Sequence, residues 1–425
     1  MENVWERPNN QSLFQYRTCS YIQHTMKVTR TTQLVVILCV LVLILLGTYF
    51  LYNYSSPDDT SQEYTMESET LVEAAQLAGD YLVRATNADG SFVYEYDAED
   101  DSESSSYNML RHAGTVYSMM QLYGVFEDED VLEAGTRAVM FLVDHVQPFE
   151  DVQCIVYNDE VKLGGSALAI IALAEYTTVA EDTQYLTLMQ TLAAYLKLSQ
   201  YPTGEFISKR IYSTGEITDF VSDYYPGEAI LALCRLYQLD ENETWLDVAE
   251  KGAQYLINVK DAGVDTYDLR HDHWLLMGLN ELYRYRENSL YLNQSQRIAE
   301  SIMYLQRDNI TRDAEEPEWL GSYYTPPRST PTAIRSEGLI AAFHLLSDYT
   351  DTKITEDILY AISLGIEFQL RTQCTQDNSD HLPNPDRALG GFREDLTSYD
   401  IRIDYVQHNI SSILGFLVIL NEEGD

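Results

Sequence analysis

Cysteine and lysine are scarce in this sequence. Only five of its 425 residues are cysteines, and Cys154, Cys234 and Cys374 follow the one long apolar stretch. Three cysteines so widely spaced give neither a disulfide framework nor a zinc-binding spacing, although one bridge among them stays possible. Seven lysines and twenty arginines stand against 67 acidic residues, and the net charge is −40. So acidic a chain argues against nucleic acid and against an anionic membrane surface as partners.

Several catalytic signatures are also missing. The sequence contains no Gly-x-x-x-x-Gly-Lys phosphate loop and no Gly-x-Ser-x-Gly nucleophile turn, which argues against the enzyme classes built on them. His271 and His273 stand close together, but no cysteine or carboxylate cluster completes a zinc-like ligand set around them. We therefore expect neither a metal ion nor an organic cofactor.

One apolar stretch is long enough to cross a membrane. Residues 34–51 read LVVILCVLVLILLGTYFL without a charge, and as a helix they rise about 27 Å. The length favours an uncleaved signal anchor over a cleaved signal peptide. Lys27 and Arg30 precede the stretch, and no cation follows it until Arg84. The positive-inside rule then predicts a cytoplasmic N-terminus and an extracellular or lumenal main domain.

These signals divide the chain into four parts. We expect a cytoplasmic segment over 1–33, a transmembrane signal anchor over 34–52, a polar stalk over 53–67 and one folded domain over 68–425. Met26 is an alternative start. Five of the six Asn-x-Ser/Thr triplets follow the anchor, which is compatible with a glycoprotein whose domain lies outside the cytoplasm. They begin at Asn53, Asn242, Asn293, Asn309 and Asn409.

Six similar apolar segments recur along the domain. Each is apolar on nearly every face, which is typical of buried helices, and they end at Tyr123, Tyr176, Tyr237, Tyr283, Tyr349 and Leu420. Amphipathic segments with helical periodicity alternate with them. These run near 69–85, 131–146, 183–199, 244–259, 294–307 and 355–371.

The alternation predicts an all-α fold of six helical hairpins. If the hairpins close on themselves, the apolar helices form an inner ring and the amphipathic ones an outer ring, which is the (α/α)6 toroid. An open superhelix of helical pairs is the alternative. Closure is favoured because no polar terminal pair is present to cap an open stack. Strand signals are confined to short loops such as 91–96.

The short segments at the starts of the six apolar helices carry the candidate site. A toroid gathers these segments around one cavity. In this acidic chain they stand out by mixing Arg, His, Tyr and Trp with isolated carboxylates, which is typical of a polar pocket. Any one of these residues could instead cap or pack a helix, but their recurrence favours a functional cavity. The candidates are Arg111, His112, Asp223, Tyr225, Arg270, His273, Trp274, Arg335, Glu337, Arg402, Asp404, Tyr405 and His408.

Two segments resemble a known family. GEAILALCRLY at 227–237 is similar to an inner helix of glucuronyl C5-epimerases, and RIDYVQH at 402–408 is similar to their C-terminal Arg-Trp-Asp-Tyr segment. TSYD at 397–400 is similar to a Tyr-Asp motif upstream of it. The resemblance implies a helical toroid that acts on uronic-acid sugars, with Tyr405 and Tyr399 in the active site.

Three functions follow as hypotheses. The first is a glycan-processing enzyme for an acidic sugar, such as a C5-epimerase, in which a cation holds the sugar carboxylate and acid/base groups move a proton. Arg111, Arg335 and Arg402 are candidates for the cation, and Tyr225, Glu337, Tyr405 and His408 for the acid and base.

The second hypothesis is a six-hairpin glycoside hydrolase or lyase. It would use one or two carboxylates poised over the sugar, among Asp223, Glu228, Glu337 and Asp404. The third is a membrane-tethered binding protein without catalysis, in which the inner ring is simply a packed core.

Overall fold

The structure, a computed structural model, describes residues 68–308, 316–349 and 352–424. These belong to one compact unit that extends over Thr65–Asp425. The expected cytoplasmic segment, signal anchor and stalk all lie outside the described residues.

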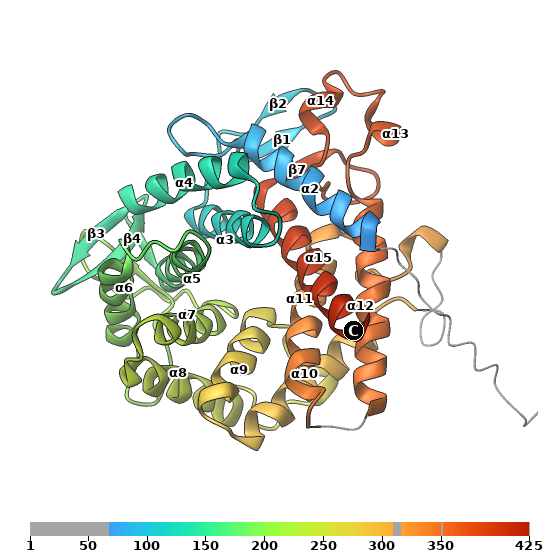
Figure 1. Cartoon of the computed structure of the whole chain (residues 1–425). Helices are drawn as coiled ribbons and strands as arrows, with labels where there is room; N and C mark the ends of the chain where they lie inside the picture. Colours follow the sequence, from blue (N-terminus) through green and yellow to red (C-terminus); the bar gives the residue numbers. More distant parts are fainter. Residues whose placement is uncertain (1–67, 309–315, 350–351, 425) are drawn as a thin grey trace, which may run out of the picture. The chain divides into compact units, whose positions relative to one another are not determined.

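Twelve helices of the described chain form six hairpins, each with an outer helix followed by an inner one (Figure 1). The outer helices are α2 (Ser68–Ala85), α4 (Glu129–Asp144), α6 (Leu186–Leu198), α8 (Glu243–Tyr255), α10 (Ser289–Leu305) and α12 (Thr352–Arg371). The inner helices are α3 (Met109–Phe126), α5 (Leu163–Val179), α7 (Tyr225–Asp240), α9 (His273–Tyr285), α11 (Ser329–Leu346) and α15 (Ile403–Gly424).

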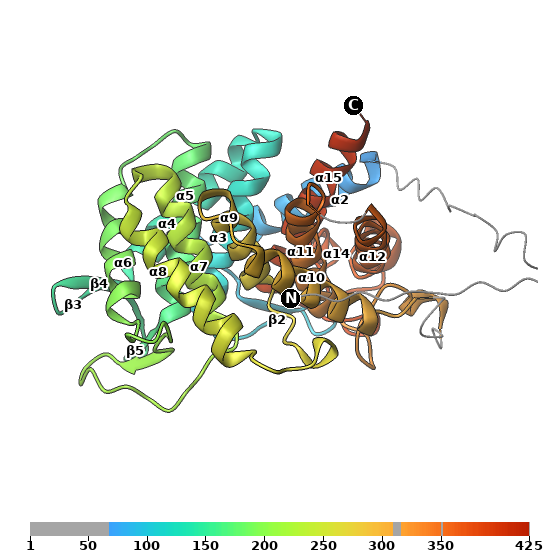
Figure 2. The ribbon, with the colours of Figure 1, turned by 90° about the horizontal axis from the view of Figure 1, so that it is seen from below.

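The inner helices close into a ring. Each packs against the next in chain order, and the last, α15, packs against the first, α3. The expected (α/α)6 toroid is therefore confirmed, and the open superhelix is wrong because its terminal helices would not meet. Figure 2 shows the same helices from below the view of Figure 1.

Burial explains which helices lie inside. In α5, apolar and small residues cover the whole circumference, and 14 of its 17 residues are buried. In α4 the buried residues follow one stripe that includes Val131, Ala138 and Leu142, as expected for a helix with one solvent face. Short polar side chains begin several helices by accepting backbone N–H bonds: Asn108 at α3 and Asp272 at α9.

The inner helices run in the same direction. Arg111 near the start of α3 pairs with Asp404 near the start of α15, whereas Gln121, ten residues further along α3, accepts from Ser411 of α15. The starts of the inner helices therefore share one end of the ring, as the sequence predicts.

Short strands decorate this helical frame. β3 (Val146–Phe149), β4 (Val152–Tyr157), β5 (Glu160–Lys162) and β6 (Lys209–Ile211) form an antiparallel sheet in that order. A smaller sheet pairs β1 (Glu95–Asp97) with β2 (Ser102–Glu103) and with β7 (Asp400–Arg402). β1 lies where a strand was expected, but the four-stranded sheet was not anticipated beyond the general expectation of short strands.

Remaining connections use short helices: η1 (Leu256–Lys260), η2 (Thr266–Asp268), η3 (Pro317–Trp319), α13 (Gln376–Ser379) and α14 (Pro385–Ala388).

Three further features bear on the expectations for the whole chain. Within the described ranges, Ile403–Glu422 is the one helix with the length and apolar composition of a membrane span, but 78% of that stretch is buried as part of the inner ring. Cys154, Cys234 and Cys374 are buried free thiols. Asn409 is fully buried and donates to Ser329 and to the Tyr405 carbonyl, so its Asn-x-Ser triplet is not open to glycosylation in the folded domain.

Candidate active site

A histidine–glutamate–histidine cluster lies where three inner helices meet. His273 is the first residue of α9, Glu337 lies in α11, and His408 lies in α15. His408 Nδ1 is 2.7 Å from Glu337 Oε2, a hydrogen bond, and His273 Nε2 is 3.8 Å from the same oxygen. The two imidazole rings meet edge to face, with centroids 5.3 Å apart. We call these three residues the His–Glu–His cluster.

Close helix packing brings the cluster together. Gly338, beside Glu337, faces the start of α9, and a Cβ atom built on it would lie 2.9 Å from Leu276 Cδ1 and 3.3 Å from His273 Cα. A larger residue there would push α11 away from α9. The glycine therefore lets the carboxylate of Glu337 reach both histidines.

Burial perturbs the ionisation of the cluster. Burial, with smaller contributions from His408 and Arg335, lowers the pKa of His273 well below its usual value. Burial raises the pKa of Glu337, and the hydrogen bond to His408 opposes that rise. His273 is therefore a neutral imidazole near pH 7.

Three atoms of the cluster lack partners. Both ring nitrogens of His273 and Oε1 of Glu337 are buried without a hydrogen bond from the described residues. Buried polar atoms are rarely left so, because losing their hydration is costly. Because three such atoms lie together here, the cluster is the candidate binding site.

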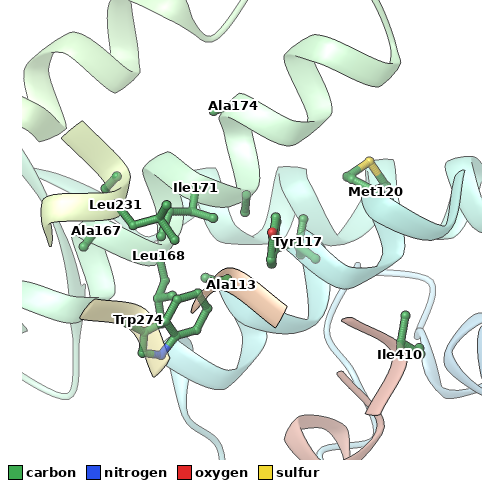
Figure 3. Close-up of a cluster of buried hydrophobic side chains, with 14 of the residues drawn as sticks. Ala113, Tyr117, Met120, Ala167, Leu168, Ile171, Ala174, Leu231, Trp274 and Ile410 are labelled. Atoms are coloured by element: carbon green, nitrogen blue, oxygen red, sulfur yellow. The ribbon is translucent and has the colours of Figure 1, made fainter. Parts of the chain in front are cut away.

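The middle of the ring next to the cluster is packed and apolar. Trp274, beside His273, belongs to a buried cluster with Leu168 of α5, Leu231 of α7 and Tyr117 of α3 (Figure 3). A cavity of about 190 Å³ lies further along the ring, and Glu337 forms part of its wall. Glu337 thus borders both the two histidines and this cavity, whose wall also includes Gln121, Arg235 and Glu281.

An arginine lies beside the cluster. Arg335 precedes Glu337 by two residues in α11 and is 7% exposed. Its Nε donates to His271 Nδ1 over 2.8 Å, and its Nη2 donates to the Tyr324 hydroxyl over 2.8 Å. The Tyr224 ring lies on another side, 6.1 Å from that of His273. Of the candidates, the structure therefore brings together His273, Trp274, Arg335, Glu337 and His408.

Four other candidates form a separate polar group at the same end of the ring. Asp404 accepts from Arg402 Nε over 2.5 Å and pairs with Arg111 Nε at 3.0 Å. The Arg402 guanidinium lies 4.3 Å from the centre of the Tyr405 ring, and burial raises the pKa of that phenol. Both cations of this group are thus balanced by a carboxylate, and Tyr405 is held as a neutral, buried phenol.

The remaining candidates lie elsewhere. His112 is buried against α4, where its Nε2 bonds the Ala138 carbonyl and its Nδ1 bonds Tyr107, so packing explains it. Tyr399 lies directly before β7, and its hydroxyl donates to the carbonyl of Asn378 in α13.

Asp223 pairs with Lys260 and with Arg270, which is 72% exposed. Tyr225 begins α7, and its ring lies 5.9 Å from that of Phe220. The structure brings none of these five into the His–Glu–His cluster, so the expectation of one convergent set is wrong for them.

Sequence reasoning left Tyr224, His271 and Tyr324 off the candidate set. Tyr224 and His271 are each adjacent in sequence to a candidate residue, so their position along the chain could have identified them. Tyr324 lies in an irregular loop before α11 and reaches the site only through the fold.

The cluster is also the place where a metal ion could bind. One ligand atom from each of His273, Glu337 and His408 lies within 4.8 Å of the others, and this chemistry suits several divalent ions. Alternatively, the cluster works without a metal ion, and the direct 2.7 Å hydrogen bond between His408 and Glu337 is its functional contact. Activity after treatment with a chelator distinguishes these two readings.

Comparison with known proteins gives a likeness of fold. No protein-family model and no curated protein matches the sequence. Among solved structures, a D-mannose isomerase aligns with a TM-score of 0.63 and 12% identity, over 86% of this chain and all of that one. The shared architecture is the (α/α)6 toroid.

Two other neighbours act on sugars in different ways. The cellobiose 2-epimerase of Bacillus thermoamylovorans aligns with a TM-score of 0.63 and 14% identity, covering 83% of this chain and 100% of that one. An inactive variant of an α-1,6-mannanase of Salegentibacter, bound to α-1,6-mannotriose, gives a TM-score of 0.56 and 12% identity over 82% and 99%. The expected resemblance to six-hairpin toroid carbohydrate enzymes is thus confirmed, whereas at these identities the reaction has to be argued from the site.

Proposed function

We propose that this protein is a carbohydrate epimerase or isomerase that acts on an acidic sugar. The observation that carries the proposal is the His–Glu–His cluster, in which two histidines flank one buried carboxylate. The fold of D-mannose isomerase and of cellobiose 2-epimerase supports the substrate class.

The cluster suits proton transfer at a carbon next to a carbonyl or carboxylate group. A neutral imidazole takes the carbon-bound proton, and the second imidazole donates to the oxygen that gains negative charge. Ring centroids 5.3 Å apart allow the two groups to reach neighbouring atoms of one sugar. Glu337 orients His408 through the 2.7 Å hydrogen bond and stabilises the positively charged form from which His408 donates its proton. Return of the proton to the other face, or to the neighbouring carbon, gives the epimer or the isomer.

A hydrolase is the alternative, and the carboxylates disfavour it. The mannanase neighbour is inactive in a variant that replaces two consecutive aspartates. The one such pair among the described residues, Asp100 and Asp101, lies in the turn between β1 and β2 rather than at the start of an inner helix. Glu228 is buried, and burial beside Asp272 raises its pKa well above the usual value. It forms no ion pair with a cation of the described residues.

The acidic sugar is supported by the cation beside the cluster. Arg335 is buried and forms no ion pair with a carboxylate of the described residues, in a protein whose net charge is −40. In so acidic a chain, a guanidinium group without a carboxylate partner favours an anionic ligand. The sequence resemblance to glucuronyl C5-epimerases supports a uronic acid, with exchange at C5.

The location is a proposal from the sequence. Residues 34–52 form a signal anchor, and the toroid lies on the extracellular or lumenal side, since Lys27 and Arg30 precede the anchor. Protease added to sealed vesicles whose cytoplasmic face is outward should leave the toroid intact. Loss of the domain in these vesicles would reverse the orientation.

Product analysis tests the reaction. The purified protein is incubated with defined uronate oligosaccharides and with reducing uronates and aldoses, and the products are identified by NMR. A new epimer or ketose that disappears in His408→Asn supports the proposal. Shortened chains identify a hydrolase or lyase instead, and binding without any product identifies the non-catalytic alternative.

A further inference from the structure

Arg335 differs from the other candidate cations in its surroundings. Arg111 and Arg402 both pair with Asp404. Arg335 forms no ion pair with any carboxylate of the described residues, although it is 7% exposed. A buried cation without a counter-charge is costly, so its retention indicates a partner that arrives with a ligand.

Neutral groups hold the Arg335 guanidinium in place. Its three hydrogen bonds to the described residues go to His271 Nδ1, to the Pro331 carbonyl over 2.6 Å, and to the Tyr324 hydroxyl. The guanidinium stacks on two rings, with its carbon 4.6 Å from the centre of Tyr323 and 5.0 Å from that of Tyr324. A guanidinium has five N–H donors, so two are left for a ligand even before any bond is exchanged.

The position of Arg335 relates it to the His–Glu–His cluster. It lies on α11 two residues before Glu337, and its Nε partner, His271, lies two residues before His273. Its bond to His271 and its electrostatic effect on His273 place the guanidinium on the His273 side of the cluster, so a sugar held there by an anionic group would lie next to that imidazole.

Tyr324 is the most exchangeable of the three partners. Its side chain is 57% exposed, and its backbone has φ = 67°, which is uncommon for a tyrosine. Two bonds from Arg307, of 3.1 and 2.6 Å, hold its carbonyl oxygen. The backbone is thus fixed while the ring can swing into solvent and release Arg335 Nη2.

We propose that Arg335 binds the carboxylate of the sugar substrate and that the Tyr324 hydroxyl occupies the place of that carboxylate until substrate arrives. The planar guanidinium fork matches two carboxylate oxygens better than a single hydroxyl. This inference rests on the proposed function for the identity of the sugar. It selects Arg335, rather than Arg111 or Arg402, as the residue that makes the site specific for acidic sugars.

Calorimetry with the detergent-purified full chain tests the assignment. Three ligands are compared: D-glucuronate, its neutral amide D-glucuronamide, and D-glucose 6-phosphate. A charge-assisted bond to a buried guanidinium gives about a 10- to 100-fold gain in affinity, so wild type should bind glucuronate more tightly than glucuronamide by that factor. Arg335→Gln should remove the difference. Arg328→Gln, just before α11, should keep it, since Arg328 pairs with Glu394 and is half-exposed.

Tyr324→Phe separates specificity from mere packing. It keeps the ring and removes the hydroxyl that competes with the ligand, so glucuronate should bind about 2- to 10-fold more tightly while glucuronamide is unaffected. Wild type and Tyr324→Phe still decide the question if Arg335→Gln fails to fold.

Equal binding of glucuronate and glucuronamide by wild type would overturn the proposal, as would an equal loss of both ligands in folded Arg335→Gln. Tighter binding of the phosphate than of glucuronate would overturn the carboxylate assignment. Binding requires no turnover, so selective binding without epimerisation would refute the proposed reaction and leave this site standing.

Discussion

Replacing Glu337 with glutamine tests whether the buried carboxylate serves the reaction. The substitution keeps the shape of the side chain and one oxygen acceptor for His408, but it removes the negative charge. Two opposite charges 2.7 Å apart attract by about 6 kcal/mol at an effective dielectric constant of about 20. An amide dipole keeps part of this attraction. If about half is lost for the protonated His408 that has to donate, the proton-donating form becomes rarer and kcat falls by about 10²-fold.

The assay is the initial rate of epimer or isomer formation at saturating substrate, with circular dichroism to confirm the fold. Because burial raises the pKa of Glu337, its ionised form is costly in the folded state, and Glu337→Gln should unfold at the same temperature as wild type or higher. Glu175→Gln is the matched control, since Glu175 is also an inner-helix carboxyl, 3.9 Å from Arg235 at the far end of the ring. A Glu337→Gln enzyme with more than a third of the wild-type kcat would refute the role of the carboxylate.

Further outcomes are expected from the same site. His273→Asn should lower kcat by about 10²- to 10⁴-fold with little change in KM, as for loss of a general acid or base; a pure KM effect would make His273 a binding residue. Dialysis against a chelator should leave activity unchanged, and loss that is restored by a divalent ion would make the cluster a metal centre. Burial raises the pKa of Asp272 to about 7, so folded Asp272 keeps a proton that the unfolded chain loses near pH 4. The free energy of unfolding should therefore fall between about pH 4 and 7, and urea denaturation of Asp272→Asn should show a smaller fall; identical slopes would contradict the shift.

The frame of the fold could be predicted because helix periodicity is a local signal. All six apolar segments became inner helices, and all six amphipathic ones became outer helices. Closure could be argued only from the absence of polar caps, and it is decided by packing of α15 on α3. The four-stranded sheet was missed because β5 and β6 have three residues each, too few for an alternating pattern to stand out.

The site was predictable only in part, because position before a helix does not determine what a side chain contacts. His273, Glu337 and His408 were on the candidate list, but nothing in the sequence separated them from His112. The difference is tertiary: His112 meets a backbone carbonyl of α4, whereas His408 meets a carboxylate from α11. Likewise, Arg335 became distinct from Arg402 only when the fold showed which of them has a carboxylate partner.

Hydrogen exchange at carbon tests the central claim most directly. The protein is incubated with a uronate substrate in heavy water, and deuterium at each sugar carbon is measured by NMR. The account predicts deuterium at a single carbon next to the carbonyl or carboxylate group, at C5 for a uronate residue, without chain cleavage, and loss of this label in His408→Asn. Cleavage without carbon-bound deuterium, or label that persists unchanged in His408→Asn, would contradict it.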